Sequence, residues 1–321
     1  MEQNASFMHK IPRRMAGSCH VPNSSTAVIV LGMSRSGTSL TTSAIAALSG
    51  GGEAAWRGTG ARYPDDGANS LGYFERLDVV RLNYEALRSI GYSWTQFEPE
   101  FSRMPRSISR WPEQVRKKFL DKAAPIMSDM RRRAPFVLKD VRFSRTLPLW
   151  APLLASGAMP HKNGSRRPSG VGPGFACVLP FRHPSEVALS SRALPTALGR
   201  MRLWQSYILA ALASTRSANC PVLLVEYDAW FTSAAAQLAK LRRFLGCAGL
   251  RLAPGAAALE PGSFVHPEQR HHRTADRGQP LPADISCLLR ALRSGEALQW
   301  RLDGHTPTPC STPDTHSDHK T

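Results

Sequence analysis

The residues best suited to chemistry lie in a short loop of glycine, serine and threonine at residues 32–39. Gly32 and Gly37 let the backbone wrap closely around a ligand, and the hydroxyl groups of Thr38 and Ser39 add hydrogen-bond donors. The loop follows an apolar β-branched run and precedes a helix-period stretch, so its N–H groups and a helix N-terminus would face one anion. This arrangement favours phosphate binding, although an ordinary turn between a strand and a helix uses the same residue types.

The spacing of the two glycines matches the phosphate loop of nucleoside triphosphatases, G-x-x-x-x-G-K-[ST], but the lysine is missing. Thr38 stands where that lysine would be, and the cation lies inside the loop at Arg35. A kinase without this lysine lacks its main contact to the β- and γ-phosphates. The pattern therefore disfavours ATP chemistry. A P-loop kinase stays an alternative, in which Asp140 would be the metal-binding acid.

The composition describes a globular protein with a strongly positive charge. The chain has 321 residues, 42% of them hydrophobic, which is enough to bury a full core. Lys and Arg number 41 against 24 Asp and Glu, a formal net charge of +17. This charge favours acidic partners such as nucleotides, anionic glycans, nucleic acid or lipid headgroups. A nucleic-acid-binding protein is a further alternative, but no recognition motif and no interleaving of aromatic and basic residues indicates one.

The sequence lacks the patterns that are typical of metal-binding, disulfide-rich and membrane-spanning proteins. The six cysteines are scattered and form no C-x-x-C pair, so we expect neither a structural metal site nor a disulfide framework. No apolar run of about 18 residues predicts a membrane span, and the N-terminus lacks the apolar core of a signal peptide. We therefore expect a cytoplasmic protein without a transmembrane span.

Alternation of strands with helices predicts an α/β fold. Strands are expected at residues 26–33, 135–138, 175–181 and 221–226. Because these strands are almost continuously apolar, we expect a parallel sheet with helices on both faces, which is a three-layer arrangement. Each charged motif follows a strand, and ligands of open α/β sheets bind at that edge.

Composition predicts three parts of the chain. A flexible leader at residues 1–25 precedes a folded domain at 26–302, and a tail at 303–321 is rich in Thr, Pro, His and Asp and is expected to be disordered. Inside the domain, residues 49–72 are rich in glycine and predict a long loop.

Charged side chains also follow the second and third strands. Lys139 and Asp140 end the second strand, and Arg182 ends the third, with Ser190 eight residues later. That spacing puts Ser190 two turns into the next helix, on the side that faces back toward the strand end. Arg182 and Ser190 would together form a second anion site, although a surface ion pair would also explain Arg182.

Several of these segments resemble the nucleotide-dependent sulfotransferases, in particular their bacterial branch. Residues 32–39 resemble the family's 5′-phosphosulfate loop in its G-M-x-R-S-G-T-S form, and residues 69–75 its N-P-x-G-Y-[FW]-E segment. Arg182 and Ser190 are similar to its 3′-phosphate motif. Residues 139–142 resemble its K-D-P-R segment, with valine in place of the proline.

The resemblance spans residues 26–292 and implies a P-loop NTPase-like sulfotransferase fold. The implied reaction moves a sulfuryl group from 3′-phosphoadenosine 5′-phosphosulfate (PAPS) to a hydroxyl or amine, without a metal. The acceptor stays open between a glycan, a glycolipid and a small molecule, and the positive charge suits an anionic one. No nucleic-acid partner is expected.

The resemblance also implies roles for individual residues. The donor would be bound by Ser34, Arg35, Ser36, Gly37, Thr38, Ser39, Arg182 and Ser190. Arg35 would in addition stabilise charge on the leaving oxygen, whereas Ser34 replaces a histidine that is common in bacterial relatives. Arg270, His271 and Arg273 would close over the 3′-phosphate, although a solvated basic loop explains them equally well.

The base that takes the acceptor's proton is the least determined role. Glu75 is the first choice, since some relatives use a glutamate, and Glu53 and Asp140 are the other choices. An acidic residue at the start of a helix also simply complements the helix dipole, which leaves a structural role for Glu75 open.

Overall fold

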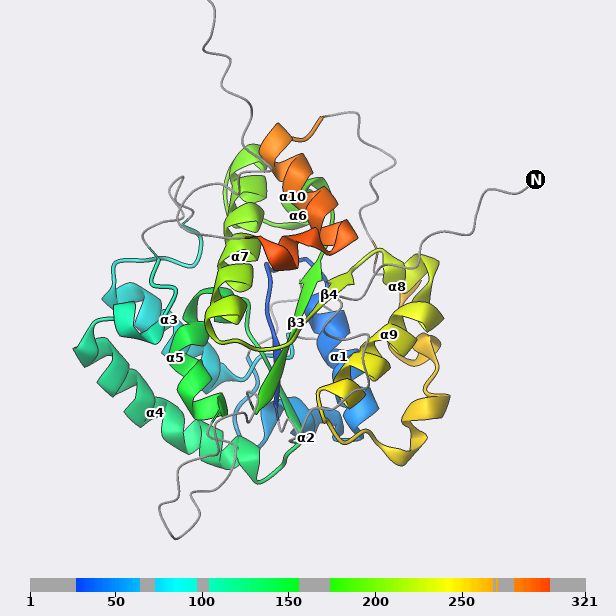
Figure 1. The fold of residues 1–321 in the computed structure, drawn as a ribbon, viewed down its shortest axis with the longest axis horizontal. Coiled ribbons are helices and arrows are strands. Elements are labelled where there is room, and N and C mark those ends of the chain that lie inside the picture. Colours follow the sequence, from blue (N-terminus) through cyan, green and yellow to red (C-terminus); the bar gives the residue numbers. More distant parts are fainter. Residues whose placement is uncertain are drawn as a thin grey trace, which may run out of the picture.

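In the computed structural model, a parallel sheet of four strands lies at the centre of the part of the chain that is described, residues 27–63, 73–96, 104–155, 174–267, 270 and 280–300 without the side chains of 52–54. Its strands are β1 (Ala27–Val30), β2 (Phe136–Lys139), β3 (Phe175–Phe181) and β4 (Val222–Glu226), in the order β2-β1-β3-β4 (Figure 1). All three pairings are parallel, and Ala27 of β1 lies opposite Phe136 and Phe175. The predicted parallel sheet is confirmed.

Helices connect the strands. They are α1 (Thr38–Ser49), α2 (Gly52–Arg57), α3 (Leu77–Ser89), α4 (Glu113–Arg131), α5 (Phe143–Ala155), α6 (Pro184–Ser190), α7 (Ala197–Ser217), α8 (Ala229–Thr232), α9 (Ala234–Cys247) and α10 (Ala283–Ser294). Short 3₁₀ turns are η1 (Ile108–Arg110), η2 (Pro254–Ala258), η3 (Pro261–Ser263) and η6 (Glu296–Gln299).

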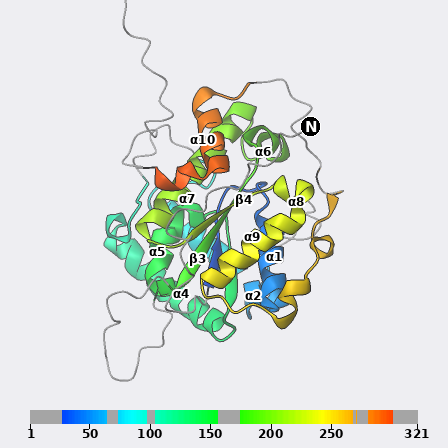
Figure 2. The same ribbon diagram turned by 45° about the vertical axis from the view of Figure 1, so that its right-hand side comes forward.

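Alternate residues of β1 enter two different hydrophobic clusters, one on each face of the sheet. Ile29 packs in a cluster with side chains of α3, α4, α5, α7 and α10. Val28 and Val30 pack in the other, with side chains of α1, α2, α8 and α9. Successive side chains of a strand point to opposite faces, so the sheet is covered on both sides, as Figure 2 shows. The strands are therefore almost wholly apolar because neither face meets water.

Two details correct the expectations from sequence. Residues 49–72 were expected to form one long loop, but α2 begins at Gly52, two residues after Gly50, the left-handed glycine that ends α1. The glycine residues here lie at the break between α1 and α2, and they do not prevent α2 from forming. Cys247 and Cys287 each take part in a disulfide, whereas Cys177 and Cys220 are free and buried. Spacing along the chain carries no signal for such pairs.

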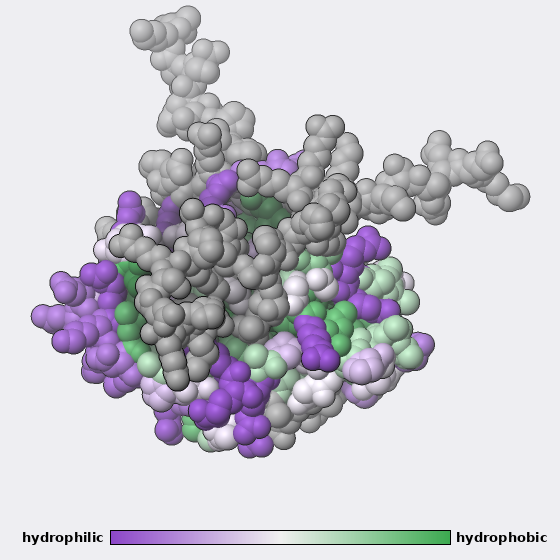
Figure 3. All heavy atoms as spheres, turned by 60° about the horizontal axis from the view of Figure 1, so that its bottom comes forward, coloured by the Kyte–Doolittle hydropathy of each residue, from purple (hydrophilic) through white to green (hydrophobic). Residues whose placement is uncertain are grey.

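Several other expectations fall outside the described residues. These are the leader at 1–25, the tail at 303–321 and residues 69–72 of the segment at 69–75. Within the described part of the chain, no helix combines the length and the apolar character needed to cross a membrane. On the face drawn in Figure 3, hydrophilic side chains gather toward the left of the view.

Candidate functional site

The loop between β1 and α1 needs its two glycines. Gly32 and Gly37 have φ values of 107° and 86°, a region that residues with a Cβ atom rarely adopt. A Cβ atom at Gly32 would lie 2.8 Å from the carbonyl oxygen of Pro180, and one at Gly37 would collide with the ring of Tyr227. The loop is thus pressed against β3 and the end of β4, which fixes its shape.

The interior of the loop holds an unused hydrogen-bonding group. Ser36 is fully buried, and its Oγ atom has no hydrogen-bond partner. Helix α1 starts directly after the loop, with Thr38 as its first residue and no side-chain cap, and the N-terminal turn of a helix favours anions. Ser34 and Ser39 are half-buried beside them. Backbone shape, helix N-terminus and an orphaned hydroxyl together fit a bound phosphate.

Arg35 connects the loop to a distant part of the chain. Its Nε atom donates a hydrogen bond of 2.8 Å to Oγ of Ser190, the last residue of α6. The two residues are 155 positions apart in the sequence. Two motifs from distant parts of the sequence therefore lie in direct contact at the carboxyl edge of the sheet.

Arg182 lies at the same edge but is already engaged. Its Nε atom donates a hydrogen bond of 2.7 Å to Oε2 of Glu186, and both side chains are buried. The guanidinium carbon lies 4.4 Å from the centre of the Tyr227 ring, the ring that also lies under Gly37. Arg182 is therefore held by an acid and an aromatic ring behind the loop, rather than in an exposed salt bridge.

On the other side of the loop, Glu75 and Lys139 form a buried ion pair. Lys139 ends β2, and its Nζ atom also donates a hydrogen bond of 3.3 Å to Oγ of Ser39. The second carboxylate oxygen of Glu75, Oε2, is buried without a hydrogen-bond partner. Burial raises the pKa of Glu75 to about 7, against the lowering effect of Lys139. Glu75 thus combines a spare oxygen with the pKa of a base that works near neutral pH.

Asp140 is fully occupied by its neighbours. Its Oδ1 atom accepts hydrogen bonds from the backbone N–H of Arg142 at 3.0 Å and from its Nη1 at 2.7 Å, and Oδ2 accepts one of 2.8 Å from Asn83. Asn83 in turn accepts from Thr146 and Trp150. This network positions β2 and α5, and it gives both carboxylate oxygens of the buried Asp140 a partner within the fold.

The remaining expectations are partly described. Glu53 lies in α2, and its side chain falls outside the described residues. Arg270 donates a hydrogen bond of 2.7 Å to Oδ1 of Asp228, which directly follows Tyr227 after β4. His271 and Arg273 are not among the described residues. Among those that are, no group of three His, Cys, Asp or Glu side chains could hold a metal ion.

Sequence reasoning missed two residues of this edge and one behind it. Lys139 was noted only as part of a motif, yet it lies between Ser39 and Glu75. Tyr227 supports both Gly37 and Arg182, and its position directly after a strand was the available signal. Ser144 fastens the loop from α5: its Oγ atom accepts from the N–H of Gly32 at 2.9 Å. Nothing in the sequence indicates this last contact.

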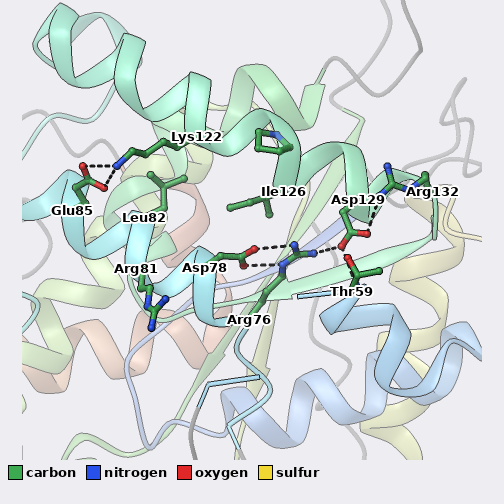
Figure 4. A pocket seen from close by; sticks show the side chains of 11 residues that line it. Thr59, Arg76, Asp78, Arg81, Leu82, Glu85, Lys122, Ile126, Asp129 and Arg132 are labelled. Carbon is green, nitrogen blue, oxygen red and sulfur yellow. Dashed lines mark hydrogen bonds and ion pairs between the residues drawn. The ribbon is translucent and has the colours of Figure 1, made fainter. Parts of the chain in front are cut away.

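A pocket of about 640 Å³ lies elsewhere, between α3 and α4 (Figure 4). Apart from the exposed Arg81, its charged side chains pair with one another: Arg76 with Asp78 and Asp129, Arg132 with Asp129, and Lys122 with Glu85. We place the candidate site at the strand edge instead, because polar groups there keep unused hydrogen-bonding capacity.

Comparison of the chain with protein-family models, curated proteins and solved structures gave no match. We therefore infer function from the fold and from the geometry of this edge.

Proposed function

We propose that this chain is a sulfotransferase that transfers the sulfuryl group of PAPS to a hydroxyl or amine acceptor. The observation that carries the proposal is the hydrogen bond between Arg35 and Ser190. This bond joins the loop that could bind one phosphate to Ser190, the residue expected at the 3′-phosphate. A donor that carries phosphate groups at both the 5′ and 3′ positions of one ribose needs two such anion sites side by side.

The 5′-phosphosulfate would lie against the loop. The N–H groups of the first turn of α1 and the hydroxyl groups of Ser36, Thr38 and Ser39 would donate hydrogen bonds to it. Ser190 would turn its hydroxyl to the 3′-phosphate, and Arg182 would supply positive charge from behind. Arg35, between the two anion sites, would contact both.

The chemical step needs one proton acceptor and stabilisation of charge. The acceptor oxygen or nitrogen attacks sulfur, the new bond to sulfur forms, and the bond from sulfur to the 5′-phosphate oxygen breaks. Oε2 of Glu75 takes the acceptor's proton. The electron pair leaves with 3′-phosphoadenosine 5′-phosphate (PAP), where Arg35 and Lys139 stabilise the developing charge. Because sulfuryl transfer needs little covalent help, positioning and charge would account for most of the rate.

Two features favour sulfuryl over phosphoryl transfer from ATP. The position after Gly37 lacks the lysine of a triphosphate loop. Asp140, the acid that a kinase would use for its metal, is engaged by Arg142 and Asn83. Lys139 does bring an ammonium group to Ser39, but it is shared with Glu75, an arrangement that suits a base beside the reacting group.

Calorimetric titration with PAP tests the proposal, with ATP and magnesium as the comparison ligand. We expect micromolar binding of PAP and at least tenfold weaker binding of ATP. Ser190→Ala, which removes one hydrogen bond to an anion, should weaken PAP binding about tenfold or more. Binding of ATP in preference to PAP would contradict the proposal and favour the kinase. Binding of neither would contradict the proposal and favour a nucleic-acid ligand. The affinity of the chain for nucleic acid would then fall steeply as the salt concentration rises.

A further inference from the structure

Four aromatic rings in the part of the chain around Glu75 are partly exposed: those of Tyr63 and Tyr73, which contact each other, and those of Tyr84 and Trp94, which lie near Arg142. We call them the aromatic cluster. They include three of the six tyrosines of the chain. Large aromatic side chains gain most when they are buried or in contact with a ligand, so a group of half-buried rings next to a candidate base calls for a functional explanation.

The backbone ties the cluster to Glu75. The N–H of Tyr63 donates a hydrogen bond of 2.8 Å to the carbonyl oxygen of Glu75, and Arg62 and Arg76 form an antiparallel bridge next to it. The rings of Tyr63 and Tyr73 meet edge to face, with their centres 5.9 Å apart. Burial raises the pKa of Tyr63, and Tyr84 and Glu75 raise it further, so these side chains lie within one electrostatic neighbourhood.

Arg142 fixes the other two rings. Its guanidinium carbon lies 3.8 Å from the ring centre of Tyr84 and 5.8 Å from that of Trp94. Asp140 holds the same guanidinium through a hydrogen bond of 2.7 Å. Two rings are therefore oriented by a buried, neutralised cation that stacks on Tyr84, so a ligand would meet rings that are already held in place.

We propose that the aromatic cluster is the acceptor site and that the acceptor is a phenol or another planar aryl alcohol. This inference rests on the proposed sulfuryl transfer. The ring of the acceptor would pack against Tyr63, Tyr84 and Trp94, with its hydroxyl directed to Oε2 of Glu75.

The polar groups around the cluster argue against a sugar acceptor. Recognition of a sugar needs hydrogen-bonding side chains for several hydroxyl groups. Here Asp140 is engaged by Arg142 and Asn83, and Asn83 accepts from Thr146 and Trp150. Among the described residues, these two side chains are engaged within the fold, so a polyol that gave up hydrogen bonds to water would gain little from them, which is costly. A flat ring with one hydroxyl group needs only one polar partner.

The acidity of the acceptor also favours a phenol. A phenol has a pKa of about 10, within reach of a base such as Glu75 whose pKa is about 7, whereas an aliphatic alcohol is far less acidic. The step is balanced as above: the phenolic oxygen bonds to sulfur, its proton goes to Glu75, and the sulfur–oxygen electron pair leaves with PAP.

The test compares two acceptors of similar size, phenol and cyclohexanol, which differ in both planarity and acidity, with a neutral disaccharide as a third arm. Formation of PAP from PAPS and the sulfated product are measured by mass spectrometry. We expect phenol to be sulfated at least about 100-fold faster than cyclohexanol or the disaccharide. PAP affinity is measured in parallel by calorimetry.

Two variants at one position test the ring. Tyr63→Phe keeps the ring and should leave KM for phenol within about twofold of the unchanged chain. Tyr63→Leu removes the stacking surface and should raise that KM about tenfold. PAP affinity should not change in either variant, which shows that both are folded.

Each outcome decides between the two proposals. Turnover of the disaccharide or cyclohexanol in preference to phenol, with PAP still bound, overturns the acceptor site and leaves the sulfotransferase standing. An equal KM for phenol in Tyr63→Leu and Tyr63→Phe does the same. Failure to bind PAP removes the proposed function and the acceptor site with it.

Discussion

Glu75 and Arg76 are adjacent in the sequence and almost equally buried, yet they serve different parts of the molecule. Arg76 faces the pocket between α3 and α4, where Asp78 binds two of its nitrogens at 2.8 Å each and Asp129 a third at 2.5 Å (Figure 4). Glu75 faces the strand edge, where only one of its oxygens is paired, with Lys139.

The difference shows how a structural charge can be told from a functional one. Both residues carry charge into a poorly solvated place, and burial alone does not separate them. Arg76 has satisfied its hydrogen bonds within the fold, so any ligand would first have to break them. Glu75 keeps one oxygen unsatisfied at a cost in stability, which is the pattern of a site that awaits a partner. The predictions below test this contrast.

The largest effect is expected at Glu75. Glu75→Gln keeps the shape of the side chain but cannot take a proton, so kcat for sulfuryl transfer should fall by about 10²–10⁴-fold. PAP affinity should stay within about threefold, since the donor contacts lie in the loop. Steady-state kinetics and calorimetry measure the two effects. Unchanged kcat would remove Glu75 as the base.

The pH dependence of the unchanged chain sharpens the same point. The pKa of Glu75 is raised from 4.5 to about 7, chiefly by burial. Activity should therefore rise with pH through about 7, as the carboxylate forms, and this limb should be absent in Glu75→Gln. The contribution of Glu75 to stability has the opposite sign: it is lost as the pH rises from 4.5 toward 7, because the folded state holds the proton more tightly than the unfolded one.

At Arg76, the expected effect is on stability alone. Asp129→Ala leaves the guanidinium of Arg76 buried with only Asp78 as its acid, and should lower the free energy of unfolding by about 3 kcal/mol. Glu85→Gln, in the same pocket, affects an exposed pair with Lys118 and Lys122 and should cost at most about 1 kcal/mol. Urea denaturation measures both. A loss of PAP affinity in folded Asp129→Ala would mean that the pocket takes part in function.

A smaller effect separates backbone strain from contact in the loop. Gly37 and Gly91 have similar φ values, 86° and 78°, but only Gly37 faces a side chain, the ring of Tyr227. Gly91→Ala should cost about 1–2 kcal/mol of stability from strain and leave PAP binding unchanged. Gly37→Ala adds the collision and should also weaken PAP binding, by calorimetry. Equal effects of the two substitutions on PAP binding would show that the loop does not contact the donor.

The sequence was sufficient for the layers of the fold because its periodicities are strong. The apolar run at residues 175–181 predicts β3 with its observed bounds. The prediction of one long loop after α1 was wrong. Glycine residues indicate a turn, but they do not indicate how short the break between two helices is. The order β2-β1-β3-β4 depends on contacts between distant segments, which no local pattern encodes.

The site was predictable in its types of residue and less so in its partners. The motif around Arg182 indicated an anion ligand, but its pairing with Glu186 needed the path of α6. Asp140 remained a choice for the base until its hydrogen bonds to Asn83 and Arg142 were seen. Whether the oxygens of a buried acid are already hydrogen-bonded depends on its neighbours in three dimensions, not on its place in a motif.

The most direct test compares two arginine variants in one PAP titration. Arg35 lies in the loop, and Arg132 lies at the pocket between α3 and α4 with an exposed side chain. Arg35→Ala and Arg132→Ala change the net charge equally. We expect PAP to bind at least tenfold more weakly to Arg35→Ala and with unchanged affinity to Arg132→Ala. Equal losses would mean that PAP responds only to the overall charge, and a loss confined to Arg132→Ala would place the anion site in the pocket and contradict a donor site at the strand edge.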